Sequence, residues 1–390
     1  MHFDKTEENH NYSFMTLILF WAGLVVMSSL YVTIPLIEVF SKEFSITQEQ
    51  AVWASSTFSF CFAGGCLMYG PLSEKYGRKK VIFLGLVALS VITFALGFVR
   101  SFPFLILLRA IQGAAAATFS PVALSYAQEL FPQHKKVGAV GWISTGFLMA
   151  GIIGQVFSSF VQANLGWNWV FLLSSAIYIL TAVLIWFFIP MRPANGANIT
   201  VALKQIPKTI QNKQLICAYI VASILLLSFV GMYTALGSYL THQFSLNGQQ
   251  IFYVRLLGIL GMILSPMAGN LVKRFSVIRV LRFALILALI GLVLLSFGIN
   301  AGIMIISSIV FVSGIAIAIP SLISLIGILG GQLKGIAISI YTFILFLGAS
   351  IGPILTTNLL KTGNYMLTFL SIAGCVVIGI FATFFIKPVE

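Results

Sequence analysis

Hydrophobic residues in this chain gather in long runs that are separated by short polar gaps. Twelve runs are long enough to cross about 30 Å of hydrocarbon as a helix. The predicted spans cover residues 14–40, 48–72, 79–99, 102–128, 137–162, 168–190, 214–240, 248–272, 278–298, 301–327, 334–360 and 364–386. The pattern therefore predicts an all-α polytopic membrane protein with twelve transmembrane helices.

The longest polar gap divides the spans into two sets of six. It covers residues 191–213 and contains Pro193, Pro207 and several basic residues. We expect this stretch to link an N-terminal bundle, residues 1–190, to a C-terminal bundle, residues 214–390.

Parts of the first half return in the second half about 200 residues later. Residues 41–50 (SKEFSITQEQ) align with 241–250 (THQFSLNGQQ), residues 70–77 align loosely with 269–276, and Gly154 aligns with Gly352. Each match falls at the same place in a six-span unit. An internal repeat of this kind predicts two pseudo-symmetric, parallel six-helix bundles related by an axis along the membrane normal, with a cleft between them.

The basic residues predict the orientation, because cytoplasmic loops carry an excess of lysine and arginine. With both termini in the cytoplasm, the outer loops hold only Lys42, Arg100 and Lys361, while Arg109 and Arg255 lie within spans. The other 17 of the 22 basic residues fall on the cytoplasmic side: Lys5, Lys75, Arg78, Lys79, Lys80, Lys135, Lys136, Arg192, Lys204, Lys208, Lys213, Lys273, Arg274, Arg279, Arg282, Lys334 and Lys387. We expect a multi-pass protein of the inner or plasma membrane, and a monomer.

Composition agrees with a lipid environment and argues against other classes. The chain is 59% hydrophobic and 8% charged, with a mean hydropathy of +1.04, whereas soluble domains are about 25% charged. The net charge of +13 does not indicate nucleic-acid binding, since the basic residues lie in short loops between spans. The sequence contains no nucleotide loop, metal-ligand cluster or nucleophile–base pair. We therefore expect no enzyme activity, no cofactor and no metal.

A charged turn separates the second and third spans. It reads Gly70-Pro71-Leu72-Ser73-Glu74-Lys75-Tyr76-Gly77-Arg78-Lys79-Lys80. This segment resembles the signature loop between helices 2 and 3 of the major facilitator superfamily, although the family usually has Asp where this chain has Glu74. With its length and short linker, the chain is most similar to the bacterial drug:proton antiporters of twelve spans.

The resemblance implies that this loop forms a conformational latch. It would involve Gly70, Glu74, Gly77, Arg78 and Lys79, with Arg78 reaching Glu129 and Glu74 lying near Gly335 at the start of the eleventh span. Such contacts exist only when the cytoplasmic side is closed, so they would bias the conformational equilibrium. Without the resemblance, the residues predict only a solvated turn whose positive charges set the orientation of the neighbouring spans in the membrane.

Arg109 lies within the fourth span, where an isolated charge is costly unless it faces a partner or a wet cavity. The segment Arg109-Ala110-Ile111-Gln112-Gly113 resembles the fourth-helix pattern of the family, which links that arginine to proton coupling. Snorkelling of Arg109 to the outer surface is the alternative. Glu38 is an acidic residue within the first predicted span, near its outer end. Arg109, Gln112 and Glu38 are the candidates for proton coupling.

The substrate is expected to bind between the bundles. The candidate cavity residues are Tyr31, Trp53, Trp142, Gln155, Tyr233, Tyr253, Arg255 and Tyr341. The alternative is interfacial or lipid-facing packing for the aromatic residues, and a side chain that reaches the outer surface for Arg255. Gln155 ends a segment, Ala150-Gly151-Ile152-Ile153-Gly154-Gln155, that lacks the proline and final glycine of the antiporter pattern Gly-Pro-x-x-Gly-Gly. From Val137 to Val389 the chain has no Asp or Glu, which favours a neutral, zwitterionic or anionic solute over a cation.

These observations predict a secondary transporter that exports a small organic molecule by alternating access, coupled to protons. The first alternative is an exchanger or importer of a small organic anion. The second is a membrane receptor or scaffold that transports nothing, which the short polar segments disfavour.

Overall fold

The fold is built from helices alone in the described part of the chain. A computed structural model describes residues 11–191, 206–298 and 300–387. The N-terminal half contains α1 (Tyr12–Ser28), α2 (Ile37–Glu43), α3 (Gln48–Ala51), α4 (Trp53–Tyr76), α5 (Arg78–Leu96), α6 (Phe102–Ala116), α7 (Ser120–Leu130), α8 (Gln133–Leu165) and α9 (Trp167–Phe188). The C-terminal half contains α11 (Ile206–Gln211), α12 (Lys213–Phe244), α13 (Gly248–Leu257), α14 (Ile259–Met262), η1 (Ser265–Met267), α15 (Ala268–Arg274), α16 (Val277–Ser296), α17 (Ala301–Gly330), η2 (Gly331–Leu333), α18 (Lys334–Leu360) and α19 (Tyr365–Phe384).

The number of apolar helices agrees with the twelve predicted spans. Ten helical segments of the described chain are long and apolar enough to cross a membrane. One of them, residues 301–360, contains both α17 and α18, and the shorter α1 is apolar as well. Ten segments, one of them double, and α1 together give twelve.

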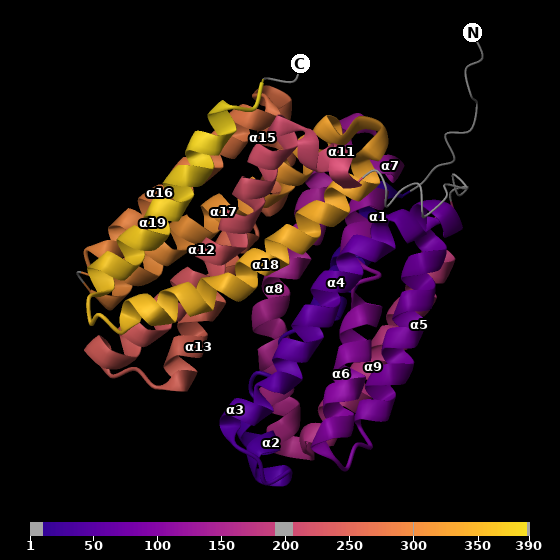
Figure 1. The fold of residues 1–390 in the computed structure, drawn as a ribbon, viewed down its shortest axis with the longest axis vertical. Helices are drawn as coiled ribbons and strands as arrows, with labels where there is room; N and C mark the ends of the chain where they lie inside the picture. Colours follow the sequence, from indigo (N-terminus) through magenta and orange to yellow (C-terminus); the bar gives the residue numbers. More distant parts are fainter. Residues whose placement is uncertain (1–10, 192–205, 299, 388–390) are drawn as a thin grey trace.

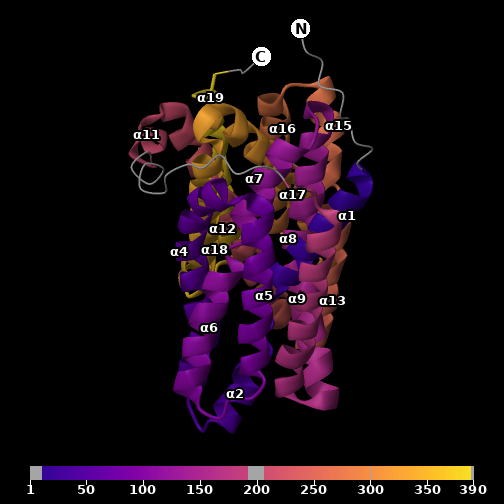
Figure 2. The ribbon, with the colours of Figure 1, turned by 90° about the vertical axis from the view of Figure 1, so that its right-hand side faces the viewer.

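Two bundles lie side by side, the N-terminal one in indigo to magenta and the C-terminal one in orange to yellow (Figure 1). Figure 2 shows that their long helices run in nearly the same direction. Within the first bundle α1 packs on α8, and within the second α12 packs on α18. Because these are the first and fifth helices of each set of six, the halves repeat one packing scheme.

The repeat is also visible in local backbone geometry. Ser45 and Ser245 are the two residues other than glycine with positive φ in the described chain, at 52° and 53°. Each is followed by a capping box, formed by Thr47 with Gln50 and by Asn247 with Gln250. In both boxes the side chains satisfy backbone N–H groups that would otherwise lack partners at the start of a helix.

Four predicted spans are broken rather than continuous, the second of them at Val52 between α3 and α4. The first was expected as one helix over 14–40, but α1 ends at Ser28 and α2 begins only at Ile37. Pro35 lies in the interruption, and the residue before a proline is disfavoured in helical conformation. The fourth span is interrupted between α6 and α7, and the eighth is divided into α13, α14, η1 and α15, where η1 includes Pro266.

The two ends of the bundle differ in character. The start of α1 and the end of α19 lie at the same end (Figure 1). We call this end the basic face, because Lys75, Lys80, Lys273 and Lys334 lie at helix ends there. The opposite face carries α2, α3 and the start of α13. Most of the predicted linker, 191–213, lies outside the described residues, and its last part forms α11.

Candidate functional site

A cavity lies between the two halves. It encloses about 200 Å³, counted as space open to the centre of a water molecule. One water needs roughly 10–15 Å³ by that measure, so the cavity is large enough for a small organic solute. Its lining comes from both halves: Met27, Tyr31, Ile34, Ser120, Leu124, Ser144, Phe147, Leu148, Gly151, Ile152, Gln155, Leu226, Phe229, Val230, Tyr233, Thr234, Arg255, Met262, Ile319, Ile323, Tyr341, Thr342, Leu345 and Phe346.

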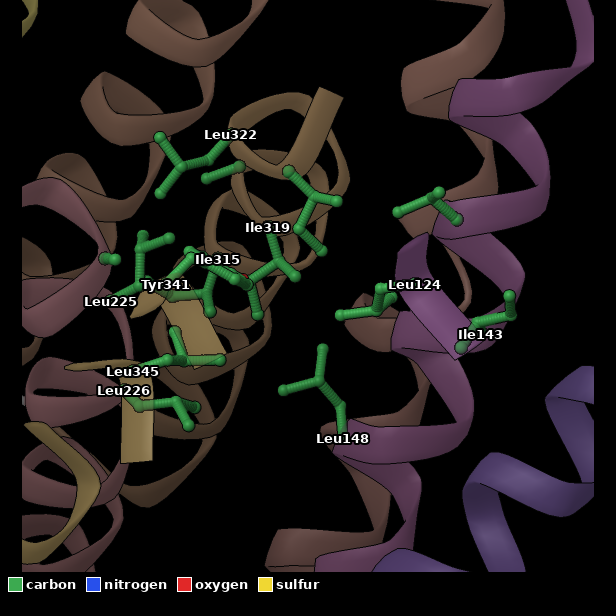
Figure 3. Close-up of a cluster of buried hydrophobic side chains, with 14 of the residues drawn as sticks. Leu124, Ile143, Leu148, Leu225, Leu226, Ile315, Ile319, Leu322, Tyr341 and Leu345 are labelled. Atoms are coloured by element: carbon green, nitrogen blue, oxygen red, sulfur yellow. The ribbon is translucent and has the colours of Figure 1, made fainter. Parts of the chain in front are cut away.

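The cavity walls are mostly apolar. In Figure 3 Leu124 and Leu148 of the N-terminal half face Ile319 and Leu345 of the C-terminal half across the space between them. Ligand sites of this kind combine hydrophobic walls with a few polar groups that fix orientation.

Five of the predicted cavity residues do line this space. Tyr31 and Gln155 come from the N-terminal half, and Tyr233, Arg255 and Tyr341 come from the C-terminal half. The Gln155 amide donates to the carbonyl of Gly151 at 2.5 Å. The Tyr341 side chain is completely buried.

The other three predicted cavity residues lie elsewhere. Trp53, at the start of α4, is 61% exposed, and Tyr253, in the middle of α13, is 56% exposed. Trp142 is 43% exposed and packs edge-on against Phe20 with ring centroids 5.8 Å apart. When every face of a helix is apolar, the sequence pattern does not show which face contacts lipid. The sequence therefore could not distinguish these three aromatic residues from those that line the cavity.

Two serines with unpaired hydroxyl groups in the cavity were not predicted from the sequence. Ser120 and Ser144 line it, and their Oγ atoms are buried without a hydrogen-bond partner among the described residues. The hydroxyls of Tyr233 and Tyr341 are also buried and unpaired there. Buried polar atoms usually have partners, so this cluster of unpaired groups is suited to a bound solute or water. Serines are common in transmembrane helices, and the sequence offered no signal that would have selected these two.

Arg109 is held entirely inside the N-terminal half. Its Nε donates to the carbonyl of Ala54 at 2.9 Å, and both Nη atoms donate to the carbonyl of Ser29 at 3.1 and 3.2 Å. It also donates to Gln112 Oε1 and to Thr33 Oγ1, the latter at 3.3 Å. The guanidinium therefore joins α6 to α4 and to the interrupted segment after α1.

This placement differs from both expectations for Arg109, because the side chain neither lines the cavity nor reaches the surface. The interruption of the first span leaves the Ser29 carbonyl without a helical partner, and Arg109 supplies its donors. The Phe58 ring lies 4.3 Å from the guanidinium carbon, which adds a cation–π contact. Gln112 extends the network by donating to Thr93 Oγ1 at 2.7 Å.

Glu38 lies apart from this network. It belongs to the short helix α2 rather than to the first transmembrane helix, and its side chain is 66% exposed. A hydrogen bond of 2.7 Å from Lys42, reinforced by the charge of the lysine, lowers the pKa of the Glu38 carboxyl. Glu38 therefore stays ionised at neutral pH and is the weaker candidate for proton coupling.

A charged network ties the helices together at the basic face. Arg78 donates to both carboxylate oxygens of Glu129, at 2.8 and 2.7 Å, and to Ser73 Oγ at 2.9 Å. Glu74 Oε1 lies 3.5 Å from Arg78 Nη2. Lys334, at the start of α18, lies 3.8 Å from Glu129, so the network spans both halves.

Glycines allow the halves to touch at this face. A Cβ at Gly335 in α18 would overlap the Glu74 carboxylate, and one at Gly70 in α4 would overlap the Ser339 hydroxyl. Gly77 has φ of 94°, a backbone region that favours glycine, and it forms the turn between α4 and α5. Lys79 lies outside this network, since its Nζ donates to the carbonyl of Trp186 at 2.6 Å.

The contacts between the halves lie from the middle of the bundle to the basic face. The closely packed helix pairs are α4 with α18, α7 with α18, α8 with α17, and α8 with α14, η1 and α15. Toward α2, α3 and α13 the two halves diverge (Figure 1). The cavity is thus closed toward the basic face.

Comparison with known proteins agrees with this architecture. The family model of the Major Facilitator Superfamily matches residues 19–353. The chain belongs to the major facilitator superfamily. Members of this family are transporters and not enzymes, so the protein is a multi-pass membrane transporter of the major facilitator fold.

Two curated relatives illustrate the range of this superfamily. An uncharacterized transporter of Buchnera aphidicola (subsp. Schizaphis graminum) is 25% identical over 352 residues, which cover 89% of this chain and 85% of the relative. The multidrug resistance protein MdtG of Klebsiella pneumoniae is 22% identical over 293 residues, which cover 71% of this chain and 70% of the relative.

Solved structures of major facilitator proteins have the same fold. The human organic anion transporter MFSD10 has a TM-score of 0.76 at 17% identity, with 94% of this chain and 98% of that chain covered. The proton:xylose symporter XylE, solved with 6-bromo-6-deoxy-D-glucose, has a TM-score of 0.76 at 14% identity, with 97% of each chain covered.

Proposed function

We propose that this protein exports a small organic molecule across the plasma membrane by alternating access, as a monomer, with protons as the coupling ion. The proposal rests on the cavity between the two halves. At the basic face this cavity is closed by close packing at small residues and by the charged network. Rocking of the two halves about this cavity would expose it to each side in turn.

The direction of opening follows from the charge distribution. Basic residues gather at the end where α1 begins and α19 ends, and such residues favour the cytoplasm. Under this orientation the structure is an outward-facing state, and the Arg78–Glu129–Glu74–Lys334 network is a cytoplasmic latch. A latch of this kind stabilises one state only, so it sets the ratio of outward-facing to inward-facing molecules.

Export and proton coupling have separate support. Export is supported by relatives whose names refer to resistance: MdtG, and a 152-residue match at 27% identity to the chloramphenicol resistance protein CraA of Acinetobacter baumannii. Proton coupling is supported by the resemblance of Arg109-Ala110-Ile111-Gln112-Gly113 to the fourth-helix pattern that the family links to proton coupling. A change of protonation or hydration next to Arg109 would alter contacts with α1 and α4, two helices that border the cavity or the latch.

The proposal is tested by flux in vesicles that contain the purified protein. We expect efflux of a loaded substrate that is driven by an imposed pH gradient and falls to the rate of protein-free vesicles when a protonophore is added. An undiminished rate would contradict proton coupling. Net uptake under the same gradient would favour the alternative, an importer or exchanger of a small organic anion.

A further inference from the structure

We propose that the transported molecule is an amphipathic organic anion whose acidic group binds Arg255 while its apolar body lies between the two halves. This inference rests on the proposed transport function and specifies its substrate class. It follows from a contrast between the two arginines that lie within the spans.

The first arginine is fully satisfied by the protein. Arg109 is completely buried, and its donors meet the carbonyls of Ala54 and Ser29 and two side-chain oxygens. The Arg255 side chain has neither an ion pair nor a hydrogen bond with the other described residues, and its Nε is buried without a partner. Its side chain lines the cavity. Arg255 is therefore an unpartnered guanidinium that faces the space between the halves.

The surroundings of Arg255 supply no negative charge. It is the one charged side chain among the described residues that line the cavity. The sequence has no Asp or Glu from Val137 to Val389, so no carboxylate of the C-terminal spans can approach it. The Arg255 side chain is only partly exposed, and an unpaired cation within a membrane-spanning segment is costly and marks substrate or ion pathways in membrane proteins. An organic anion would supply the missing counter-charge, and a guanidinium matches a carboxylate or a sulfonate with two parallel hydrogen bonds.

Further hydroxyl groups lie in the same cavity. The Tyr233 hydroxyl packs directly against Gly258, three residues after Arg255, where the absence of a Cβ leaves room for it. The Tyr233 and Tyr341 hydroxyls are both buried without partners among the described residues. A small reorientation of either group would bring a donor to the acidic group of the solute. The apolar body would then contact Leu148, Ile319 and Leu345.

The charge of the solute also bears on the driving force. A membrane potential that is negative inside favours outward movement of an anion. The membrane potential would therefore help to drive export of an anionic substrate. Because such a substrate carries no positive charge, its binding requires no carboxylate in the cavity.

Binding of matched compounds tests this proposal separately from transport. The purified protein in lipid nanodiscs is titrated calorimetrically at neutral pH with 2-naphthoate, 2-naphthamide and 2-naphthylmethylammonium, which share one apolar body. We expect the wild type to bind 2-naphthoate about tenfold or more tightly than the amide, the effect of one charge-assisted hydrogen bond. The ammonium compound should bind most weakly. Arg255→Gln should remove this preference, and Arg255→Lys should restore part of it.

Two controls separate the charge of Arg255 from other effects. Arg100→Gln removes an exposed arginine outside the cavity and should leave the preference for 2-naphthoate unchanged. Because the Arg255 side chain has no partner among the described residues and an unpaired cation is costly to bury, Arg255→Gln should melt at or above the wild-type temperature. Equal affinity of the wild type for the three compounds, or an anion preference that survives in Arg255→Gln, would overturn the inference. Loss of vesicle flux with intact anion binding would instead overturn the transport proposal alone.

Discussion

Replacement of Arg109 by alanine is expected to destabilise the protein by at least ~3 kcal/mol. The substitution leaves the Ser29 carbonyl and the Gln112 side chain without their donors, at about 1–3 kcal/mol for each unsatisfied buried group, and removal of the fully buried side chain leaves a cavity. The free energy of unfolding, measured by denaturant titration in detergent, should fall by this amount. Transport should be lost with it, because α1, α4 and α6 meet at this residue.

Arg100→Ala is the matched control, since Arg100 is exposed and lies at the end of the loop before α6. Surface substitutions of this kind are usually within about 0.5 kcal/mol of the wild type. Arg109→Lys keeps the charge but offers a compact ammonium in place of the planar fork of donors, so it should recover only part of the stability. If Arg109→Ala unfolds at the wild-type denaturant concentration, the assigned role of Arg109 is wrong.

Replacement of Gly335 by valine is expected to shift the protein toward the inward-facing state. A Cβ at this position would overlap the Glu74 carboxylate and lie 3.1 Å from Arg78 Nη2, so the added side chain would displace both groups from the latch and weaken the contact between α18 and α4. Overpacking costs about 1–3 kcal/mol, which corresponds to roughly a 5- to 150-fold change in the ratio of the two states. Transport should slow because the outward-facing state becomes rare.

Accessibility of the cavity measures this shift. A cysteine at Gln155, in a background without the four native cysteines, should react with a membrane-impermeant maleimide added outside, and Gly335→Val should slow that reaction. Gly374→Val is the matched control, because Gly374 lies in α19 with nothing within 4 Å of an added Cβ. Equal labelling rates in Gly335→Val and the wild type would mean that the basic-face contacts do not hold the outward-facing state.

The fold could be predicted from the sequence because lipid imposes strong rules on backbone and charge. Runs of apolar residues predicted the helices, and the repeat of residues 41–50 at 241–250 predicted the paired bundles. That repeat reflects local chemistry, since Thr47 with Gln50 and Asn247 with Gln250 cap helices in the same way. The charged loop after Gly70 was also informative, because a turn with that many charges must lie outside hydrocarbon.

The parts that could not be predicted depend on which face of a helix is buried. Arg109 was expected to meet a wet cavity, but the break after Ser28 provides a carbonyl inside the bundle that satisfies it instead. A continuous apolar run gives no sign of such a break apart from Pro35. For the same reason Tyr341 and Trp142 look equivalent in the sequence, although one is buried at the cavity and the other is 43% exposed.

Alternating access is the central claim of this account, and it is tested most directly by distances between paired spin labels. One pair, at Glu49 and Gln249, lies on exposed residues of the two halves near the opposite face, and the other, at Lys80 and Gln332, lies on exposed residues near the basic face. Double electron–electron resonance should show two populations, in which the first distance shortens whenever the second lengthens. Single fixed distances for both pairs, or two distances that lengthen together, would contradict the claim.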